Sequence, residues 1–265
     1  MPTAESSGAR LHYELCGNPQ GPVLVLANSM GSSLRMWDKV LPMLETSNRV
    51  LRFDMRGHGK SEIARESFTI DDLSRDVLRL MDEVHVECAS VCGLSLGGLV
   101  ALWLGIHEPE RVDRLILANT AARIGNSAMW EQRIQAVETE GMPSLAKATL
   151  ARWFAPAYRS GHPEEMETIC AMIASTDPDG YGACCAVLRD TDLSSDAGKV
   201  ISPSLIITGT HDPATPPSDG RSLHATIPDS HYVELNASHL SAWESADEFA
   251  AAVLQHLAGG EKTNG

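Results

Sequence analysis

Residues 93–98 read Gly93-Leu94-Ser95-Leu96-Gly97-Gly98 and stand between a β-rich run, Ala89–Cys92, and an apolar helical pattern, Leu96–His107. A strand that turns sharply into a helix holds the residue at the turn, here Ser95, in a strained conformation with its hydroxyl exposed. Side chains two positions before and after that serine would collide, so glycine is needed at 93 and 97. The same glycines would suit a connection that only tightens packing, but the position between strand and helix favours a serine nucleophile.

Similar short apolar runs recur along the chain and alternate with helical patterns. Strands are expected at Val23–Ala27, Val50–Phe53, Ala89–Cys92, Arg114–Ala118, Ser204–Thr208 and Tyr232–Leu235. Helices are expected between them, including Leu34–Leu44, Ile70–Val84 and Leu96–His107. A parallel sheet covered on both faces requires this alternation. The sequence therefore predicts an α/β fold with a mostly parallel sheet and helices on both faces.

The alternation stops between Thr120 and Asp196. Helical patterns follow one another there with no strand between them, at Trp130–Thr139, Pro143–Phe154 and Glu164–Ser175. We expect residues 121–195 to form a helical cap inserted into one core of residues 1–120 and 196–265. The glycine-rich tail, residues 259–265, is expected to fray.

Composition and charge limit the classes of protein to which the chain can belong. Its 265 residues are 43% hydrophobic and 21% charged, as in globular proteins with a sizeable core. The formal net charge of −14 repels phosphate backbones and anionic lipid headgroups, so we expect no binding to nucleic acid or membranes. No apolar run reaches the roughly 18 residues of a spanning helix, and no signal-peptide pattern opens the chain, so we expect a cytoplasmic protein.

The six cysteines include no CxxC pair and have no histidine partner at zinc-ligand spacing. Scattered cysteines in a chain of this length are more often small buried hydrophobic residues than a disulfide framework. We therefore expect no metal site, and the serine chemistry described next needs no cofactor.

A serine hydroxyl attacks efficiently only when a histidine takes its proton, and that histidine needs a carboxylate to hold its tautomer. At this type of turn the acid and then the histidine follow the serine in chain order. Asp212 comes after the strand Ser204–Thr208 and His239 after Tyr232–Leu235, so we choose them as acid and base.

Two alternatives to these choices remain. His211 is a second candidate for the base, and an aspartate before a proline, as at Asp212-Pro213, also opens simple turns. The other position at which an acid could follow a strand holds Asn119, which cannot carry a charge, and this favours Asp212.

Two backbone N–H groups are needed to stabilise the oxyanion that forms when serine attacks a carbonyl. One comes from the residue after the nucleophile, Leu96, and the other from a loop after an early strand. We assign the second to Met30 in Asn28-Ser29-Met30-Gly31, although these residues would also suit a plain β-turn.

The segment Asp54-Met55-Arg56-Gly57-His58-Gly59 follows the strand Val50–Phe53. Its glycines favour a tight turn, and Asp54 and Arg56 are placed to pair with each other. We interpret this segment as structural.

These motifs together resemble the α/β-hydrolase family, through Asn28–Gly31, Asp54–Gly59, Gly93–Gly98, Gly209–Asp212 and Ser238-His239. Within that family the chain is similar to the 3-oxoadipate enol-lactonases. The more specific matches are Arg35-Met36-Trp37, the run Asn119–Gly125, Arg152-Trp153-Phe154, Gly180-Tyr181 with Cys184, and Asp192-Leu193. The residues Leu240–Trp243, after the histidine, do not match that subgroup.

The resemblance implies the α/β-hydrolase fold and a small lactone as substrate. It implies that Ser95 attacks the ring carbonyl of an enol-lactone to form an acyl-enzyme, which water hydrolyses, with His239 as base in each half. Such a substrate carries a carboxylate, and a protein of charge −14 needs a local cation to bind it. We choose Arg133 and Arg152 in the cap as candidates, and Trp130 and Trp153 beside them as candidate ring contacts.

Each of these cap residues also has a plainer interpretation, because arginines usually cover solvated helix faces and tryptophans usually pack. Other enzymes of the same fold are alternatives too: a general carboxylesterase or a carbon–carbon bond hydrolase would use the same three residues. A ligand receptor that turns over slowly is the alternative from outside enzymology.

Overall fold

The computed structural model describes residues 2–63 and 67–259, and its centre is an eight-stranded sheet. The strand order is β1-β2-β4-β3-β5-β6-β7-β8. The strands are β1 (Thr3–Ser6), β2 (Ala9–Gly17), β3 (Val23–Ala27), β4 (Arg49–Phe53), β5 (Ala89–Leu94), β6 (Val112–Ala118), β7 (Ser204–Gly209) and β8 (Ser230–Leu235). The β1–β2 and β2–β4 pairs are antiparallel, and every pair from β4 to β8 is parallel. The predicted mostly parallel sheet is confirmed.

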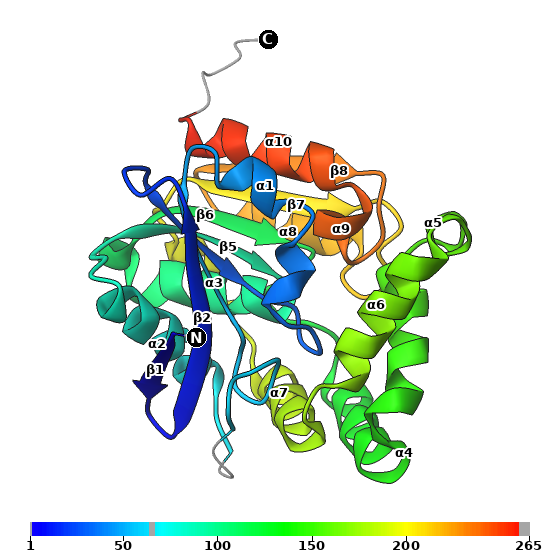
Figure 1. Ribbon diagram of the computed structural model, residues 1–265. Coiled ribbons are helices and arrows are strands. Elements are labelled where there is room, and N and C mark those ends of the chain that lie inside the picture. The colour runs from blue at the N-terminus through cyan, green and yellow to red at the C-terminus, as the bar shows by residue number, and fades with distance from the viewer. Residues whose placement is uncertain (1, 64–66, 260–265) are drawn as a thin grey trace.

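Helices cover both faces of this sheet (Figure 1). On one face lie α2 (Ile70–Glu83) and α3 (Leu96–His107), which contact each other. On the other lie α1 (Leu41–Leu44) and α10 (Ala246–Leu257), which also contact each other. The remaining helical elements of the core are η1 (Leu34–Trp37), η2 (Pro109–Arg111), η3 (Ala197–Lys199), α8 (Pro217–Thr226) and α9 (Ser241–Glu244).

Local sequence explains where α2 begins, and packing explains the apolar composition of α3. Thr69 caps α2 in a capping box with Asp72, in which each side chain accepts a hydrogen bond from the other residue's backbone N–H. Helix α3 is apolar nearly all round and is buried over Leu96–Gly105, because it packs on β3, β5 and β6 and against α2. No helix in the described residues is long and apolar enough to cross a membrane.

Four helices fill the segment between β6 and β7: α4 (Ser127–Trp153), α5 (Pro156–Gly161), α6 (Pro163–Ala174) and α7 (Pro178–Asp190). We call them the cap helices, and they lie together at one side of the sheet (Figure 1). Helix α4 is interrupted at Gly141, whose φ of 73° is not helical, two residues before Pro143. The two helical patterns expected there, Trp130–Thr139 and Pro143–Phe154, are thus the two halves of α4.

The sequence patterns missed or misplaced several elements. Strands β1 and β2 were not predicted, because β2 is only half-buried along much of its length and its apolar pattern is weak. The single helix expected at Leu34–Leu44 is wrong: the chain forms η1 and then α1, with Pro42 near the start of the second. Helix α7 was also missed, although Asp177 caps it and Pro178 opens it. All but the first residue of the predicted frayed tail lies outside the described residues.

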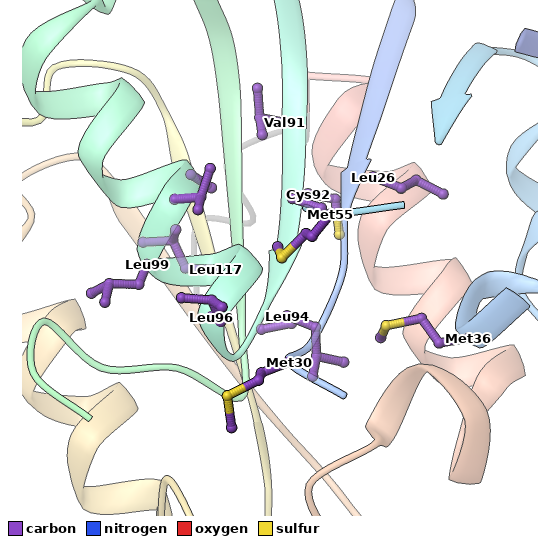
Figure 2. Close-up of a cluster of buried hydrophobic side chains, with 14 of the residues drawn as sticks. Leu26, Met30, Met36, Met55, Val91, Cys92, Leu94, Leu96, Leu99 and Leu117 are labelled. Carbon is purple, nitrogen blue, oxygen red and sulfur yellow. The ribbon is translucent and has the colours of Figure 1, made fainter. Parts of the chain in front are cut away.

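One part of the hydrophobic core lies where β3, β5, β6 and α3 meet. Figure 2 shows this cluster, in which Leu26, Val91, Cys92, Leu94, Leu99 and Leu117 are buried. Met30 and Leu96 belong to the same cluster, at the edge where β3 and β5 end. The loops after these two strands are therefore fixed by packing on a rigid core, which suits a site that needs precise geometry.

Candidate active site

Ser95 occupies the sharp turn between β5 and α3. Its φ of 59° and ψ of −116° lie in a region that residues other than glycine rarely adopt, and strain of this kind concentrates at functional sites. Two hydrogen bonds hold the strained residue: its N–H donates to Ala118 O at 2.9 Å, and its carbonyl accepts from Thr120 Oγ1 at 2.8 Å. The predicted strand-to-helix turn is present at this residue.

The two glycines that flank Ser95 are required by space. A Cβ at Gly93 would lie 2.0 Å from Gly97 O, and a Cβ at Gly97 would lie 2.1 Å from Ala27 O. Both neighbours are backbone atoms, which cannot swing aside as a flexible side chain can. The close approach of three backbone segments is what allows the tight turn.

Asp212 and His239, which are 27 residues apart in the sequence, are brought together by the loops after β7 and β8. His239 Nδ1 lies 2.8 Å from Asp212 Oδ2, and both side chains are buried. An ionised carboxylate can only accept, so Nδ1 carries the proton and Nε2 has a free lone pair. This is the tautomer in which a histidine can take a proton from serine.

Asp212 accepts several hydrogen bonds besides the one from His239. Oδ2 also accepts from Asn119 Nδ2 at 3.0 Å and from Thr215 Oγ1 at 2.8 Å. Oδ1 accepts from the backbone N–H groups of Ala214 at 2.8 Å and Thr215 at 3.1 Å. Burial alone would raise the pKa of Asp212, but the nearby His239 and these hydrogen bonds lower it below its ordinary value.

His211, the alternative base, takes no part in this arrangement. Its Nε2 lies 3.1 Å from the side-chain oxygen of Asn236, and the residue is exposed. Asp212 does open a turn before Pro213, as the alternative interpretation suggested, since its side chain accepts the next two free backbone N–H groups. The turn and the contact with His239 use different carboxylate oxygens, so one does not exclude the other.

A cavity of about 340 Å³ lies between the core loops and the cap helices. Ser95, His239, Ser29 and Met30 line it from the core side. All four cap residues chosen from the sequence line it as well, namely Trp130, Arg133, Arg152 and Trp153. Among the residues that the structure describes, no aspartate or glutamate lines the cavity, so it has a positive side in a protein of net charge −14.

Each of the two arginines makes one hydrogen bond to a neutral cap side chain. Arg133 Nε donates to Tyr181 OH at 3.1 Å, and Arg152 Nη2 donates to Thr149 Oγ1 at 3.1 Å. Neither arginine has an ion-pair partner among the described residues. A guanidinium has five N–H donors, so most of them remain for a ligand in the cavity.

The two tryptophans are both buried packing residues and cavity walls. Trp130 is 7% exposed and donates from Nε1 to Ile124 O at 2.6 Å, and Trp153 is 4% exposed. The indole of Trp130 is thereby fixed, so it presents a rigid apolar surface to the cavity.

The two amides chosen for the oxyanion hole come from opposite sides in the chain order: Leu96 directly follows Ser95, and Met30 belongs to the loop after β3, which lines the same cavity. Leu96 is the first residue of α3, so its N–H has no acceptor within the helix and lies at the positive end of the helix dipole. On the other side, the N–H of Ser29 donates to Met36 Sδ at 3.1 Å, and that of Gly31 donates to His58 Nε2 at 2.9 Å. The Met30 amide lies between these two occupied donors.

Known proteins that are similar to this chain identify its family. The α/β hydrolase fold family matches residues 22–138. A protein named 3-oxoadipate enol-lactonase 2, from Acinetobacter baylyi, is 36% identical over 251 residues, which are 95% of this chain and 94% of that protein. This chain belongs to the α/β-hydrolase family. A second protein from that organism, 3-oxoadipate enol-lactonase 1, is 34% identical over 91% of both chains.

Solved structures of α/β-hydrolases agree with the sequence relatives. The crystal structure of the enol-lactonase from Burkholderia xenovorans LB400 matches with a TM-score of 0.95 and 41% identity, over 97% of this chain and 100% of that one. A hydrolase from Pseudomonas aeruginosa matches with a TM-score of 0.93 and 42% identity, over 96% of both chains. The predicted fold and the predicted class of enzyme, a carboxylic ester hydrolase, are confirmed.

One prediction for this hydrolase is wrong: Asp54 and Arg56 do not pair with each other. The Arg56 guanidinium instead forms a bidentate pair with Asp76 of α2, at 2.5 and 2.7 Å. Asp54 accepts from His12 Nδ1 at 2.9 Å and from the backbone N–H of Leu34 at 2.7 Å. The buried carboxylate of Asp76 needs a cation, and a partner distant in sequence supplies it.

Sequence reasoning also missed residues that support the site. Asn119 was considered only as a failed acid, yet its side chain donates to Asp212 Oδ2 and to Ser238 O at 3.2 Å. Thr215 contributes two hydrogen bonds to the same carboxylate. A polar residue directly after strand β6 and a threonine three residues after the acid were the available signals, but neither specifies a partner without the fold.

Proposed function

We propose that this hydrolase opens 3-oxoadipate enol-lactone to 3-oxoadipate and acts in the breakdown of aromatic compounds. The relatives named enol-lactonase support the substrate class. The observation that carries the proposal is the composition of the cavity, whose lining includes Ser95 and His239 together with Arg133 and Arg152. Hydrolysis of a neutral ester needs only Ser95 and His239, whereas a lactone that carries a carboxylate also uses the two arginines.

In the first half of the proposed reaction, Ser95 Oγ attacks the ring carbonyl while His239 Nε2 accepts the hydroxyl proton. Asp212 stabilises the imidazolium that forms, through the 2.8 Å contact with Nδ1. The amides of Met30 and Leu96 stabilise the negative charge on the carbonyl oxygen. The ring C–O bond then breaks, and the departing enolate oxygen takes the proton from His239.

In the second half, a water molecule gives a proton to His239 and attacks the acyl-enzyme, which releases a carboxylate and restores Ser95. The enol freed from the ring in the first half remains part of the acyl-enzyme through its carbon chain, and its conversion to the ketone keeps the ring from closing again. Neither half requires a metal or an organic cofactor as a reactant.

The two arginines bind the carboxylate that the lactone carries, in this proposal. A guanidinium binds a carboxylate through two parallel N–H···O bonds, and a charged hydrogen bond of this kind contributes more than a neutral one. The cavity volume of about 340 Å³ lies near the lower end of the range for small-molecule sites, roughly 300–1,000 Å³, and suits a compact ring.

The test is turnover of freshly generated 3-oxoadipate enol-lactone beside p-nitrophenyl acetate, a neutral ester, by the unchanged enzyme and by Ser95→Ala. We expect a strong preference for the lactone and a loss of about 10⁶-fold in kcat in the variant, by the precedent of serine triads. Ser90→Ala is the matched control, because this serine lies on the same strand and bonds to Asp113 at 3.1 Å, away from the cavity.

The other outcomes are informative in different ways. Preference for the neutral ester would keep the hydrolase and reject the lactone and its pathway. Turnover that survives in folded Ser95→Ala would show that another residue is the nucleophile. Failure of both substrates would point to a carbon–carbon bond hydrolase or to a receptor on the same fold.

A further inference from the structure

His58 lies in the segment Asp54–Gly59, to which the mechanism above gives no role, and it is buried at 1% exposure. Its ring makes two hydrogen bonds, both to backbone. Nε2 lies 2.9 Å from the N–H of Gly31, and Nδ1 lies 2.8 Å from the carbonyl oxygen of Arg56. A carbonyl only accepts and an N–H only donates, so the proton is on Nδ1 and Nε2 is the acceptor.

Only the neutral imidazole satisfies both partners, because a protonated ring would turn an N–H towards the N–H of Gly31. Burial lowers the pKa of His58, which keeps the ring neutral near pH 7. The histidine is thus a fixed acceptor aimed at one peptide group.

That peptide group is the centre of a tight turn, Ser29–Ser32. The N–H of Ser32 donates to Ser29 O at 3.3 Å, and Gly31 has a φ of 80°. A bond from the first to the fourth residue and a left-handed third residue are the signature of a type II turn. The central peptide of such a turn can face either way, and the two orientations give different turn types.

His58 selects one of these orientations. Because N–H and C=O point in opposite directions in a trans peptide, the bond to the Gly31 N–H also sets the direction of the Met30 carbonyl. The preceding peptide is held separately, since Ser29 O accepts from Ser32 Oγ at 2.6 Å. The amide N–H of Met30 belongs to that peptide, so its direction is fixed from both sides.

We propose that His58 is a positioning residue for the oxyanion hole, and that it acts by holding the Gly31 N–H so that the Met30 amide faces Ser95. This inference rests on the role given to Met30 in the proposed function. The inference gives the Asp54–Gly59 segment a role in positioning the loop after β3. The side chain of Asp54 accepts a hydrogen bond from the backbone N–H of Leu34, and His58 accepts one from the backbone N–H of Gly31.

The test compares His58→Gln with His58→Asn and His58→Leu. The side-chain oxygen of glutamine is as many bonds from Cβ as Nε2 is, so it can accept from the Gly31 N–H. Asparagine is one bond shorter, and leucine has no acceptor. We expect His58→Leu and His58→Asn to lower kcat by about 10- to 100-fold, less than the roughly 10²–10³-fold of losing a donor outright, and to leave KM nearly unchanged. His58→Gln should stay within about threefold of the unchanged enzyme.

A second measurement separates positioning from general damage and does not depend on the natural substrate. A short alkyl boronic acid forms a tetrahedral adduct with an active serine, whereas adipate binds through its carboxylates alone. We expect His58→Leu to weaken the boronate by a factor similar to its loss in kcat, and to leave the affinity for adipate unchanged. If the natural substrate is not the lactone, kcat is measured on p-nitrophenyl acetate and the boronate result still stands.

His256→Leu is the matched control, because this histidine is also buried, at 8% exposure, but lies in α10 and does not line the cavity. It should lose stability without any change in boronate affinity. Equal loss in His58→Gln and His58→Leu, or unchanged boronate affinity in a folded His58→Leu or His58→Asn, would overturn the proposal. If His58→Leu does not fold, the comparison of glutamine with asparagine decides.

Discussion

Two parts of the site are held in opposite ways: the Asp212–His239 pair on the core side, and the arginines Arg133 and Arg152 on the cap side. Asp212, on the core side, receives five hydrogen bonds from four residues and is buried. Arg133 and Arg152, on the cap side, each make one hydrogen bond to a neutral side chain and remain half-buried. Asp212 lies in the loop after β7, whereas both arginines lie on α4, so the two regions differ in the element that carries them as well as in their partners.

The difference follows from what each pair must do. A carboxylate that orients a histidine works best in one geometry, and every extra donor narrows the geometry it can adopt. A guanidinium that binds a substrate carboxylate must keep its donors unoccupied until the ligand arrives. In the proposed mechanism, the core side therefore sets the reaction, and the cap side sets which molecule undergoes it.

Among the substitutions that test this difference between core and cap, the largest loss of activity is expected at Asp212. Asp212→Asn keeps the size of the side chain but can stabilise the wrong tautomer of His239, so kcat should fall by about 10⁴-fold with little change in KM. Steady-state turnover of the enol-lactone measures both constants.

Asp219→Asn provides the control for this substitution. Asp219 lies in α8, where burial and the charge of Asp212 raise its pKa, but it forms no hydrogen bond with His239. It should behave almost like the unchanged enzyme. A loss below about tenfold at Asp212 would place the acid elsewhere and make the five hydrogen bonds a structural feature only.

The cap side predicts a different kinetic pattern. Arg133→Ala and Arg152→Ala should each raise KM for the enol-lactone by about 10- to 100-fold, the equivalent of one charged hydrogen bond, with a smaller change in kcat. The KM for p-nitrophenyl acetate should change little, because that ester has no carboxylate.

Arg123→Ala is the matched control for the arginines, since Arg123 pairs with Asp192 at 3.3 Å on the surface and does not line the cavity. Equal effects of Arg133→Ala and Arg152→Ala on both substrates would show that they shape the cavity and do not bind a carboxylate. A large effect at only one of them would identify which arginine carries the specificity.

The features of the site that could be predicted from the sequence are those that depend on short segments or on chain order. The turn at Ser95 was predictable because strand, serine and glycines are adjacent in the chain, and each has a steric reason. The contact between Asp212 and His239 could be predicted because each residue follows a strand of a parallel sheet, and the carboxyl ends of such strands share an edge.

The support around these residues was not predictable in the same way. Asn119 bonds to Asp212 across 93 residues, and Arg56 bonds to Asp76 and not to Asp54. Polar partners of this kind are chosen by tertiary position, which local patterns do not encode. The helices of the cap were predicted except for α5, which has only six residues, and α7, whose Gly180 and Gly182 are weak helix formers.

One of the contacts between core and cap is expected to give the smallest effect. Lys39 Nζ in the core lies 2.7 Å from the carboxylate of Glu165 in α6, which also accepts from Tyr158 OH at 2.7 Å and from Trp243 Nε1 at 2.8 Å. The two charged side chains are 30% and 29% exposed. A double-mutant cycle with Lys39→Met and Glu165→Gln should give a coupling free energy of at most about 1 kcal/mol in urea unfolding.

The pH dependence of that coupling identifies its origin. Burial alone would raise the pKa of Glu165, but the hydrogen bond from Lys39 and those from Trp243 and Tyr158 lower it. A carboxyl whose pKa is lower in the folded state stabilises the fold above its unfolded-state pKa, and this contribution is lost as the pH falls through the folded-state pKa. The coupling should therefore be present near pH 7 and fade below about pH 4, the ordinary range of glutamate. A coupling that persists in acid would mean that the Lys39 ammonium interacts with Glu165 equally well when the carboxyl is neutral, through a hydrogen bond and not through an ion pair.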